Sequence, residues 1–575
     1  MGGPINVGGD LWHQADDGTW FKWNATAARW EPSAEPPTAS GDAPPPPPVP
    51  SPEGGAPSLA PTPDLPPAQV APTPQAAEPA ASPSPSRDFV VTTGRGGPYI
   101  PPLVLLIAGA VLVLVAFLAF VTLTGSDDDP TVAPPPPPPP APAAAGAISP
   151  RNERSIYSVL KEMQGCFGPE TLAWAGELRA GSLDRAGLKD DIARISSNLE
   201  DLRRRRFPEP VDAKIVPRSR VGKLAARISA ADINTEESKI DTKILVALGI
   251  LAPGTDLEEL GRKIVEEGVA GFYVPETKKL YAGIGSEGFV ALDEIVLAHE
   301  LDHALMDATL GLPKLVSDDP AESDRMTAHR AAIEGDATLA MLHYAVASFD
   351  PSEWQQLLSD PSAAGAVDAE AVPYVLQKSL VFPYSEGLLF ACDLFSRGGW
   401  KGVERSLRNP PTSSDQILFP DRYLRQTEVV DAPDPAAPAG WEEVRSTAFG
   451  AADLLWMIQA ARDVPMAEPD KGVEAVRGWA GGELHAWENG GDLAIQITLV
   501  DGGIGGKKDE VGYTLCRSLR GWYQDRFEKA RVVADEATRV WRNGDSFAAS
   551  SCRDQTPRLS IAPSREIAEE LVAAE

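Results

Sequence analysis

The feature that most constrains this chain is an uncharged apolar segment, Leu103 to Leu123, interrupted only by Gly109 and Thr122. At a rise of roughly 1.5 Å per residue, a helix of this length reaches about 30 Å, which matches the hydrocarbon core of a bilayer. We therefore expect a single transmembrane helix within residues 101–125. A buried helix of a soluble domain is the alternative.

The charges that flank this segment predict its orientation. Arg87 and Arg95 precede it, and three acidic residues, Asp127, Asp128 and Asp129, follow it. Because positive charge tends to stay on the cytoplasmic side, we expect a cytoplasmic N-terminus and an extracytoplasmic C-terminal part of a single-pass cell-membrane protein. The formal net charge of −30 argues against a nucleic-acid partner, since a polyanion would be repelled.

The N-terminal residues are rich in tryptophan. Asp17-Gly18 marks a tight turn between two aromatic runs, which predicts a small antiparallel sheet. The piece resembles a WW-type module, and such modules bind polyproline II segments, so a cytoplasmic partner is a possible consequence. A small hairpin with no specific ligand is the open alternative.

All four cysteines lie in the part expected outside the membrane, where disulfides form and persist. Of the three possible connectivities, we expect Cys166 with Cys392 and Cys516 with Cys552, although the sequence alone does not choose among them. Buried free thiols are an equally open alternative.

The motif HELDH, residues 299 to 303, carries the predicted chemistry. A helix is expected from Leu292 to about Leu310, so His299 and His303 lie four positions apart on one face and can bind one metal ion, for which Zn²⁺ suits the spacing. Glu300 would then take a proton from a metal-bound water without being a ligand itself. The alternative is a pair of ordinary histidines on an apolar stripe.

A third metal ligand is expected on a separate element, and Glu334 in AAIEGDATLAML is the best candidate. Gly335 beside it would be costly in a helix unless close packing required it, whereas a lone surface glutamate is the alternative for Glu334. Asp302 and Asp336 could orient the ligand histidines or be surface carboxylates. The basic run that begins at Arg203 is expected to be a solvated helix end.

AHELDHAL followed by IEGDA resembles the zincin metallopeptidases in which a glutamate is the third ligand. More narrowly, residues 205–490 are similar to a largely uncharacterised family of bacterial membrane-anchored HExxH proteins. The resemblance implies zinc ligands and a general base at the motif residues already named, and a peptide or protein substrate extended along the hairpin at residues 270–283. Phe419 departs from the family, which often has a histidine there. Tyr384 could stabilise an oxyanion, although core packing is the commoner role of a buried tyrosine.

The expected fold is α+β: a zincin-like catalytic domain with an active-site helix and a small sheet, a small C-terminal α+β domain, one transmembrane helix and a Trp-rich β module. The expected segments are 1–32, the cytoplasmic WW-like module; 33–100, a Pro/Ala/Ser-rich linker; 101–125, the transmembrane helix; 126–148, an external linker; 149–435, the metallopeptidase domain; and 436–575, the C-terminal domain.

The function expected from these features is that of a membrane-anchored extracytoplasmic zinc metallopeptidase, with His299, His303 and Glu334 as ligands and Glu300 as base. A catalytically inactive adaptor that links the cell envelope to a cytoplasmic partner is the competing interpretation, and a purely structural metal is a third. The retained Glu300 disfavours both, because neither role needs a glutamate beside a ligand.

Overall fold

The computed structural model describes part of the chain: residues 5–7, 10–14, 20–24, 29–33, 166, 188–229, 235–285, 289–313, 315, 317, 319–359, 372–462, 469–502, 511–535, 538–553 and 556–573. The chain divides into two compact units, Met1–Phe89 and Val90–Glu575. The expected linkers and the expected membrane segment lie outside the described residues.

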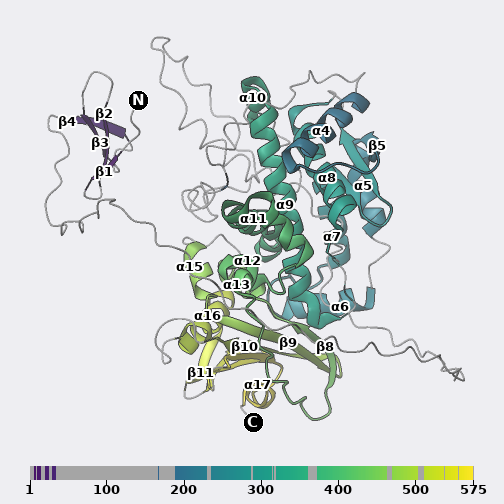
Figure 1. Cartoon of the computed structure of the whole chain (residues 1–575). Helices are drawn as coiled ribbons and strands as arrows, with labels where there is room; N and C mark the ends of the chain where they lie inside the picture. Colours follow the sequence, from purple (N-terminus) through teal and green to yellow (C-terminus); the bar gives the residue numbers. More distant parts are fainter. Residues whose placement is uncertain are drawn as a thin grey trace, which may run out of the picture. The chain divides into compact units, whose positions relative to one another are not determined.

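The first unit is a four-stranded antiparallel sheet in the order β1-β2-β3-β4 (Figure 1). Its strands are β1 (Ile5–Val7), β2 (Asp10–Gln14), β3 (Trp20–Asn24) and β4 (Arg29–Ser33). Gln14 pairs with Trp20 across the predicted turn, which confirms the small antiparallel sheet. A WW-like binding role for it stays a prediction.

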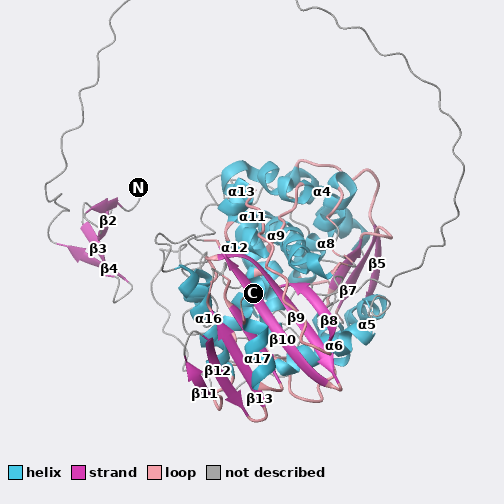
Figure 2. Ribbon diagram, turned by 90° about the horizontal axis from the view of Figure 1, so that it is seen from below, coloured by secondary structure: helices cyan, strands magenta, loops and turns pink. Residues whose placement is uncertain are grey.

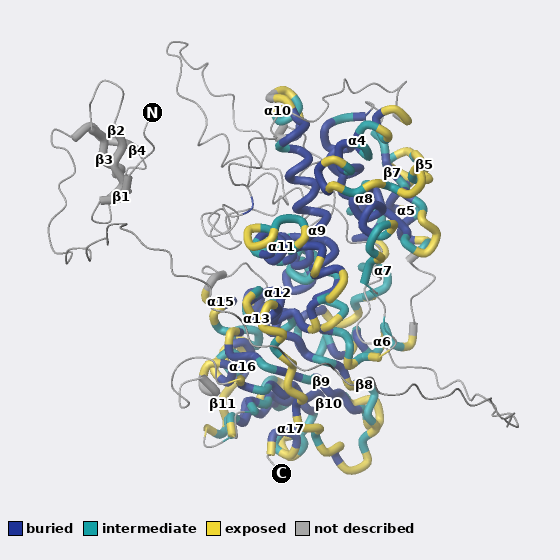
Figure 3. The backbone as a smooth tube through the Cα atoms, viewed as in Figure 1, coloured by how far each residue is buried: buried dark blue, intermediate teal, exposed yellow. Residues whose placement is uncertain are grey.

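The second unit begins with a helical layer built around two long buried helices, α8 and α9 (Figures 1 and 3). Every residue of α8 from Ala291 to Met306 is buried, because its apolar residues surround the helix and neighbours cover it on all sides. The helices of this layer are α4 (Leu188–Arg203), α5 (Arg218–Ser229), α6 (Thr235–Ala247), α7 (Leu257–Gly268), α8 (Ala291–Leu310), η4 (Pro320–Glu322), α9 (Ser323–Ser348), α10 (Pro351–Ser359), α11 (Tyr374–Arg408), α12 (Ser414–Leu418) and α13 (Pro420–Arg425).

A three-stranded sheet in the order β5-β7-β6 lies against α8. Its strands are β5 (Asp212–Pro217), β6 (Gly271–Val274) and β7 (Lys279–Ile284), of which β6 and β7 form the predicted hairpin and β5 runs parallel to β7. As an edge strand, β6 is hydrogen-bonded within this sheet to β7 alone. All four of its residues are buried, because the strand packs on α8.

The C-terminal part is a seven-stranded antiparallel sheet in the order β11-β12-β13-β14-β10-β9-β8. Helix α17 packs on its strands (Figure 2), and the largest core cluster continues from the helical layer into this sheet. Its elements are β8 (Glu442–Ala448), α14 (Ala451–Gln459), α15 (Pro469–Ala475), β9 (Trp479–Asn489), β10 (Asp492–Asp501), α16 (Val511–Arg526), β11 (Arg531–Asp535), β12 (Thr538–Asn543), β13 (Ser546–Ser551), β14 (Arg558–Ala562) and α17 (Arg565–Val572).

The α+β character expected from the sequence is confirmed, and one part of the expected fold is corrected. Within the described ranges, no helix combines the length and the apolar composition needed to cross a membrane. The longest helix, α11, carries charged side chains along its length, and those of α9 lie between Asp324 and Asp336. The predicted domain boundary at residue 435 stays a prediction.

The expected cysteine pairing is confirmed over the free-thiol alternative. Cys166 is bonded to Cys392, with their Cα atoms 5.1 Å apart, and Cys516 is bonded to Cys552, with 5.8 Å between Cα atoms. The first bond ties residue 166 to α11, and the second ties α16 to the loop after β13. Each disulfide therefore joins parts of the chain that the fold brings together.

Candidate metal centre

Helix α8 presents the two motif histidines to each other. They are four residues apart, so both side chains leave the same face of the helix. The Nε2 atoms of His299 and His303 are 3.1 Å apart, and their rings meet edge to face with centroids 4.6 Å apart. Both residues are buried, with 2% and 6% of their surface exposed.

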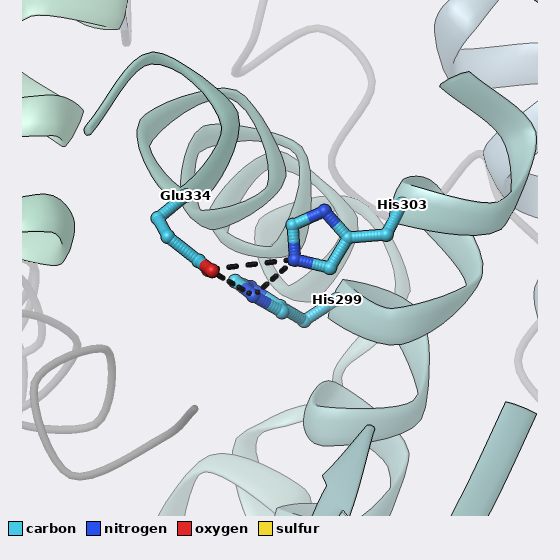
Figure 4. Close-up of side chains that lie close together, drawn as sticks. All are labelled: His299, His303 and Glu334. Carbon is cyan, nitrogen blue, oxygen red and sulfur yellow. Dashed lines mark hydrogen bonds and ion pairs between the residues drawn. The ribbon is translucent and has the colours of Figure 1, made fainter. Parts of the chain in front are cut away.

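Helix α9 brings Glu334 to the same point. Its Oε2 atom lies 3.1 Å from Nε2 of His299 and 3.4 Å from Nε2 of His303, so the three donor atoms form a nearly equilateral triangle (Figure 4). The three residues predicted as metal ligands therefore come together as a possible metal-binding triad.

The size of this triangle fits a small cation. Zinc–nitrogen and zinc–oxygen bonds of about 2.0–2.2 Å in a tetrahedral site place neighbouring donors about 3.3 Å apart. The donor separations in the triad are 3.1, 3.1 and 3.4 Å. Two imidazoles and one carboxylate are also a donor set that zinc and other first-row metals accept.

Helices α9 and α11 cross at short distance beside Glu334. A Cβ atom on Gly335 would lie 2.1 Å from the carbonyl oxygen of Gly387 on α11, and one on Gly387 would lie 2.2 Å from the carbonyl oxygen of Ala331. Neither position accepts a side chain while the helices cross at this distance. The close packing expected as the reason for Gly335 is thus present.

The electrostatics of the triad favour a positive charge at its centre. Burial alone would raise the pKa of Glu334, but the two histidines outweigh it and lower that pKa to about 2. Burial works in the opposite direction on His303, and there Glu334 prevails and raises the pKa to about 9. The pKa of His299 is lowered by burial, and the charge of His303 adds to the effect. A cation that binds here must therefore displace a proton from His303.

Glu300 lies on the side of α8 that faces strand β6. A Cβ atom on Gly271 of that strand would lie 3.5 Å from Cγ of Glu300. Burial raises the pKa of Glu300 to about 8; Glu334 adds to the shift, while His303 and the backbone amide of Tyr273 oppose it. A carboxyl group with a pKa near neutrality can both take up and release a proton at physiological pH.

Tyr384 on α11 lies beside the triad. Its ring centroid is 6.3 Å from that of His299, and the residue is 1% exposed. Burial raises the pKa of its hydroxyl well above 10, and the nearby carboxylates of Glu334 and Glu300 raise it further. The phenol therefore stays neutral and keeps a proton to donate, so this residue both fills the core and borders the site.

The sequence interpretation missed Arg203. Its side chain is fully buried and contacts both Asp302 and Asp336, so the prediction of a solvated helix end is wrong for this residue. The same contacts bury the two aspartates, which rules out the surface alternative for them. A signal was present in the sequence: two aspartates close to predicted ligands require a buried cation.

Phe419, which departs from the family pattern, and the further histidine His343 lie in different surroundings. Phe419 is buried, with the guanidinium groups of Arg422 and Arg477 over its ring at 4.7 and 4.6 Å. His343 packs between Phe395 and Trp400, and burial lowers its pKa to about 3. These contacts give both residues a packing role.

A second group of donor atoms lies in the C-terminal sheet. One ligand atom from each of Asp434, Glu483 and His485 falls within 4.8 Å of the others. His485 is buried, whereas Asp434 is exposed. The sequence gave no reason to group these residues, because Asp434 lies in a loop far from the other two along the chain.

No protein-family model and no curated protein matches this chain. Among solved structures, a protein from Chloroflexus aurantiacus described as a "putative hydrolase with a novel fold" is similar over 46% of this chain and 97% of its own length. The sequence identity is 16% and the TM-score is 0.27. A likeness this slight carries no argument about fold or activity.

Proposed function

We propose that this protein is a zinc-dependent metallopeptidase that hydrolyses peptide bonds with Glu300 as the general base. The observation that carries the proposal is the triangle of donor atoms from His299, His303 and Glu334, with separations of 3.1 to 3.4 Å, next to a buried carboxyl group that binds none of them. A structural metal site needs no such neighbour.

His299, His303 and Glu334 would hold the zinc ion and leave one side of it to water or substrate. Zinc, when bound, supplies a Lewis acid that polarises a carbonyl group and makes water acidic enough to lose a proton near neutral pH. The Glu300 carboxylate accepts that proton and passes it to the departing amine. The neutral hydroxyl of Tyr384 can donate a hydrogen bond to the oxygen that becomes negative during attack.

Strand β6 supports an extended substrate. It is an edge strand, and it lies across α8 beside Glu300. A peptide that paired with the edge of β6 opposite β7 would run past the general base in extended form. The two disulfides support an oxidising, extracytoplasmic compartment for this part of the chain.

The competing function is that of an inactive metallopeptidase-like binding or adaptor protein. The observation in its favour is that Glu300 has no exposed surface and the triad is nearly as buried. An adaptor would bind metal without cleaving peptides, so the two functions differ in one measurable property.

The test is cleavage of a mixed peptide library by the purified full-length chain loaded with zinc, with products read by mass spectrometry. The Glu300→Gln variant keeps all three ligands, so it should retain zinc and lose about 10²- to 10⁴-fold of the cleavage rate. Glu528→Gln, in the exposed turn after α16, is the matched control and should cleave like the wild type. A zinc-loaded wild type that cleaves no peptide would favour the adaptor.

A further inference from the structure

Arg203, the last residue of helix α4, joins carboxylates next to the predicted metal ligands on both α8 and α9. No part of its side chain is exposed, and the ring of Trp400 lies 4.3 Å below the guanidinium carbon. An unpaired buried charge would cost several kcal/mol, so such a side chain persists only where its partners are firmly held.

The partners of Arg203 come from both ligand-bearing helices. Nη1 donates to both carboxylate oxygens of Asp302 on α8, each at 2.9 Å. Nη2 donates to Oδ1 of Asp336 on α9 at 2.9 Å, and Nη1 reaches Oδ2 of the same carboxylate at 3.2 Å. The planar guanidinium group of Arg203 therefore connects α8 and α9 at one position along the two helices.

This connection is made by residues close in sequence to the predicted metal ligands. Asp302 directly precedes His303 in the chain, and Asp336 follows Glu334 by two positions. A forked hydrogen-bond pattern fixes direction as well as distance, so neither carboxylate can shift without breaking a bond to a buried charge. Arg203 therefore links the neighbours of the predicted ligands on α8 to those on α9.

Docking of α4 does not depend on Arg203 alone. Arg194, which precedes Arg203 in α4, donates to both oxygens of Glu294 on α8 at 2.9 and 3.0 Å, and Tyr344 of α9 donates to Glu294 at 2.5 Å. This second contact joins the same three helices but involves no residue adjacent to a ligand. A substitution of Arg194 therefore tests the attachment of α4 without removing a contact to a neighbour of the metal ligands.

We propose that Arg203 is a positioning residue that fixes the spacing of α8 and α9 at the metal centre and thereby sets its metal affinity and coordination geometry. The inference rests on the proposed function, since it assumes that the triad binds metal. Contacts of this kind to the neighbours of metal ligands typically change affinity by about 10- to 100-fold.

The test compares Arg203→Met and Arg203→Lys with Arg194→Met in the full-length chain. Zinc affinity is measured by competition with a chromophoric chelator, and cobalt(II) replaces zinc so that its d–d absorption reports the coordination geometry. We expect Arg203→Met to weaken zinc binding about 10- to 100-fold and to alter the cobalt spectrum. Arg203→Lys keeps the charge but loses the fork, so it should fall between Arg203→Met and the wild type.

Arg194→Met is the matched control, since it breaks an ion pair between the same helices and should lower stability while leaving zinc affinity and the cobalt spectrum unchanged. If Arg203→Met does not fold, the triple variant Arg203→Met with Asp302→Asn and Asp336→Asn removes the unpaired charges and takes its place. Unchanged affinity and spectrum in the folded variants, or an equal effect of Arg194→Met, would overturn the inference. A wild type that binds no zinc would overturn the proposed function and the inference with it.

Discussion

Two places in the described part of the chain bring histidine and carboxylate groups within metal-binding distance of one another. One is the triad of α8 and α9, and the other is the group of Asp434, Glu483 and His485 on the C-terminal sheet. Each group offers three donor atoms, but the triad has two histidines and one carboxylate, whereas the sheet group has one histidine and two carboxylates. Their surroundings differ in ways that decide what each can bind.

In the sheet, a single imidazole has both nitrogens already occupied. Nδ1 of His485 is 2.8 Å from a carboxylate oxygen of Glu443, and Nε2 is 2.9 Å from one of Glu483. A histidine that donates from both nitrogens is an imidazolium, which must lose a proton and give up an ion pair before it can bind a metal. The Glu443 side chain is 42% exposed, so water competes for its charge.

In the triad, the two imidazoles instead point one nitrogen each at a common carboxylate oxygen, and all three residues are buried. Proximity of donor atoms is therefore a weak criterion for a metal site. Convergence of several ring nitrogens on one point, with a buried second layer such as Arg203 behind them, is the stronger one.

The largest effect expected is on metal content. The full-length wild type should hold about one zinc ion per chain, and His303→Ala and Glu334→Ala should each reduce that to near zero, because a zinc site requires at least three protein ligands. His485→Ala should leave the zinc content unchanged. Elemental analysis after dialysis against buffered zinc measures all four proteins under the same conditions.

Two zinc ions per wild-type chain, with one lost in His485→Ala, would show that the sheet group binds metal after all. The distinction between convergent and ion-paired histidines would then fail. One zinc ion that survives His303→Ala would place the metal elsewhere in the chain.

A smaller effect is expected from Gly335→Ala at the crossing of α9 and α11. The added methyl group would overlap the Gly387 carbonyl, and such overpacking costs typically about 1–3 kcal/mol of unfolding free energy. This loss exceeds the gain of up to about 1 kcal/mol that alanine brings to a helix. Urea denaturation, followed by circular dichroism, measures the change.

The control for this variant is Gly261→Ala in α7, where a Cβ atom would meet nothing within 4 Å. There the helix gain stands alone, so stability should rise by about 0.5–1 kcal/mol. A Gly335→Ala protein as stable as the wild type would mean that the helices can separate at no cost. The close crossing would then not be what positions Glu334.

Much of the triad could be predicted from sequence because its signals are local. The spacing of His299 and His303 follows from helical geometry. Gly335 next to Glu334 indicated close packing at this position, because a glycine is otherwise costly in a helix. The hairpin at residues 270–283, which forms as β6 and β7, is likewise local, because a short turn joins its two strands. In each case neighbouring residues carried the information.

The features of the site that the sequence did not predict depend on contacts between segments far apart in the chain. Arg203 lies in a basic run that looks solvated, and only the fold shows that its partner Asp336 is 133 positions away. The approach of Tyr384 to the triad depends on the crossing of α9 and α11. The grouping of Asp434 with His485 likewise needs the sheet to form. No local pattern encodes these distances.

The smallest effect expected is the pH dependence of the sheet group. Burial lowers the pKa of His485, but the hydrogen bonds that it donates to Glu483 and Glu443 outweigh this effect, so the pKa in the folded state lies above the ordinary 6.5. A raised pKa means that the ion pairs stabilise the fold fully below about pH 6.5 and lose that effect as the pH rises through the folded-state value. Because the partners are partly exposed, the contribution is about 1 kcal/mol or less.

The measurement is the difference in unfolding free energy between wild type and His485→Gln from pH 5.5 to 9. This difference should decrease as the pH rises, because only the wild type loses a charged partner for Glu443 and Glu483. His343→Gln is the contrasting variant: burial lowers the folded-state pKa of His343 to about 3, so only the unfolded wild type takes up a proton below about pH 6.5, and its difference should increase as the pH rises from 5.5 towards 7. A difference for His485 that is flat, or that increases with pH, would mean that its pKa is not raised in the folded protein and that the two carboxylates do not hold it as an imidazolium. One ring nitrogen would then be free to accept a metal, and the contrast with the triad would lose its physical basis.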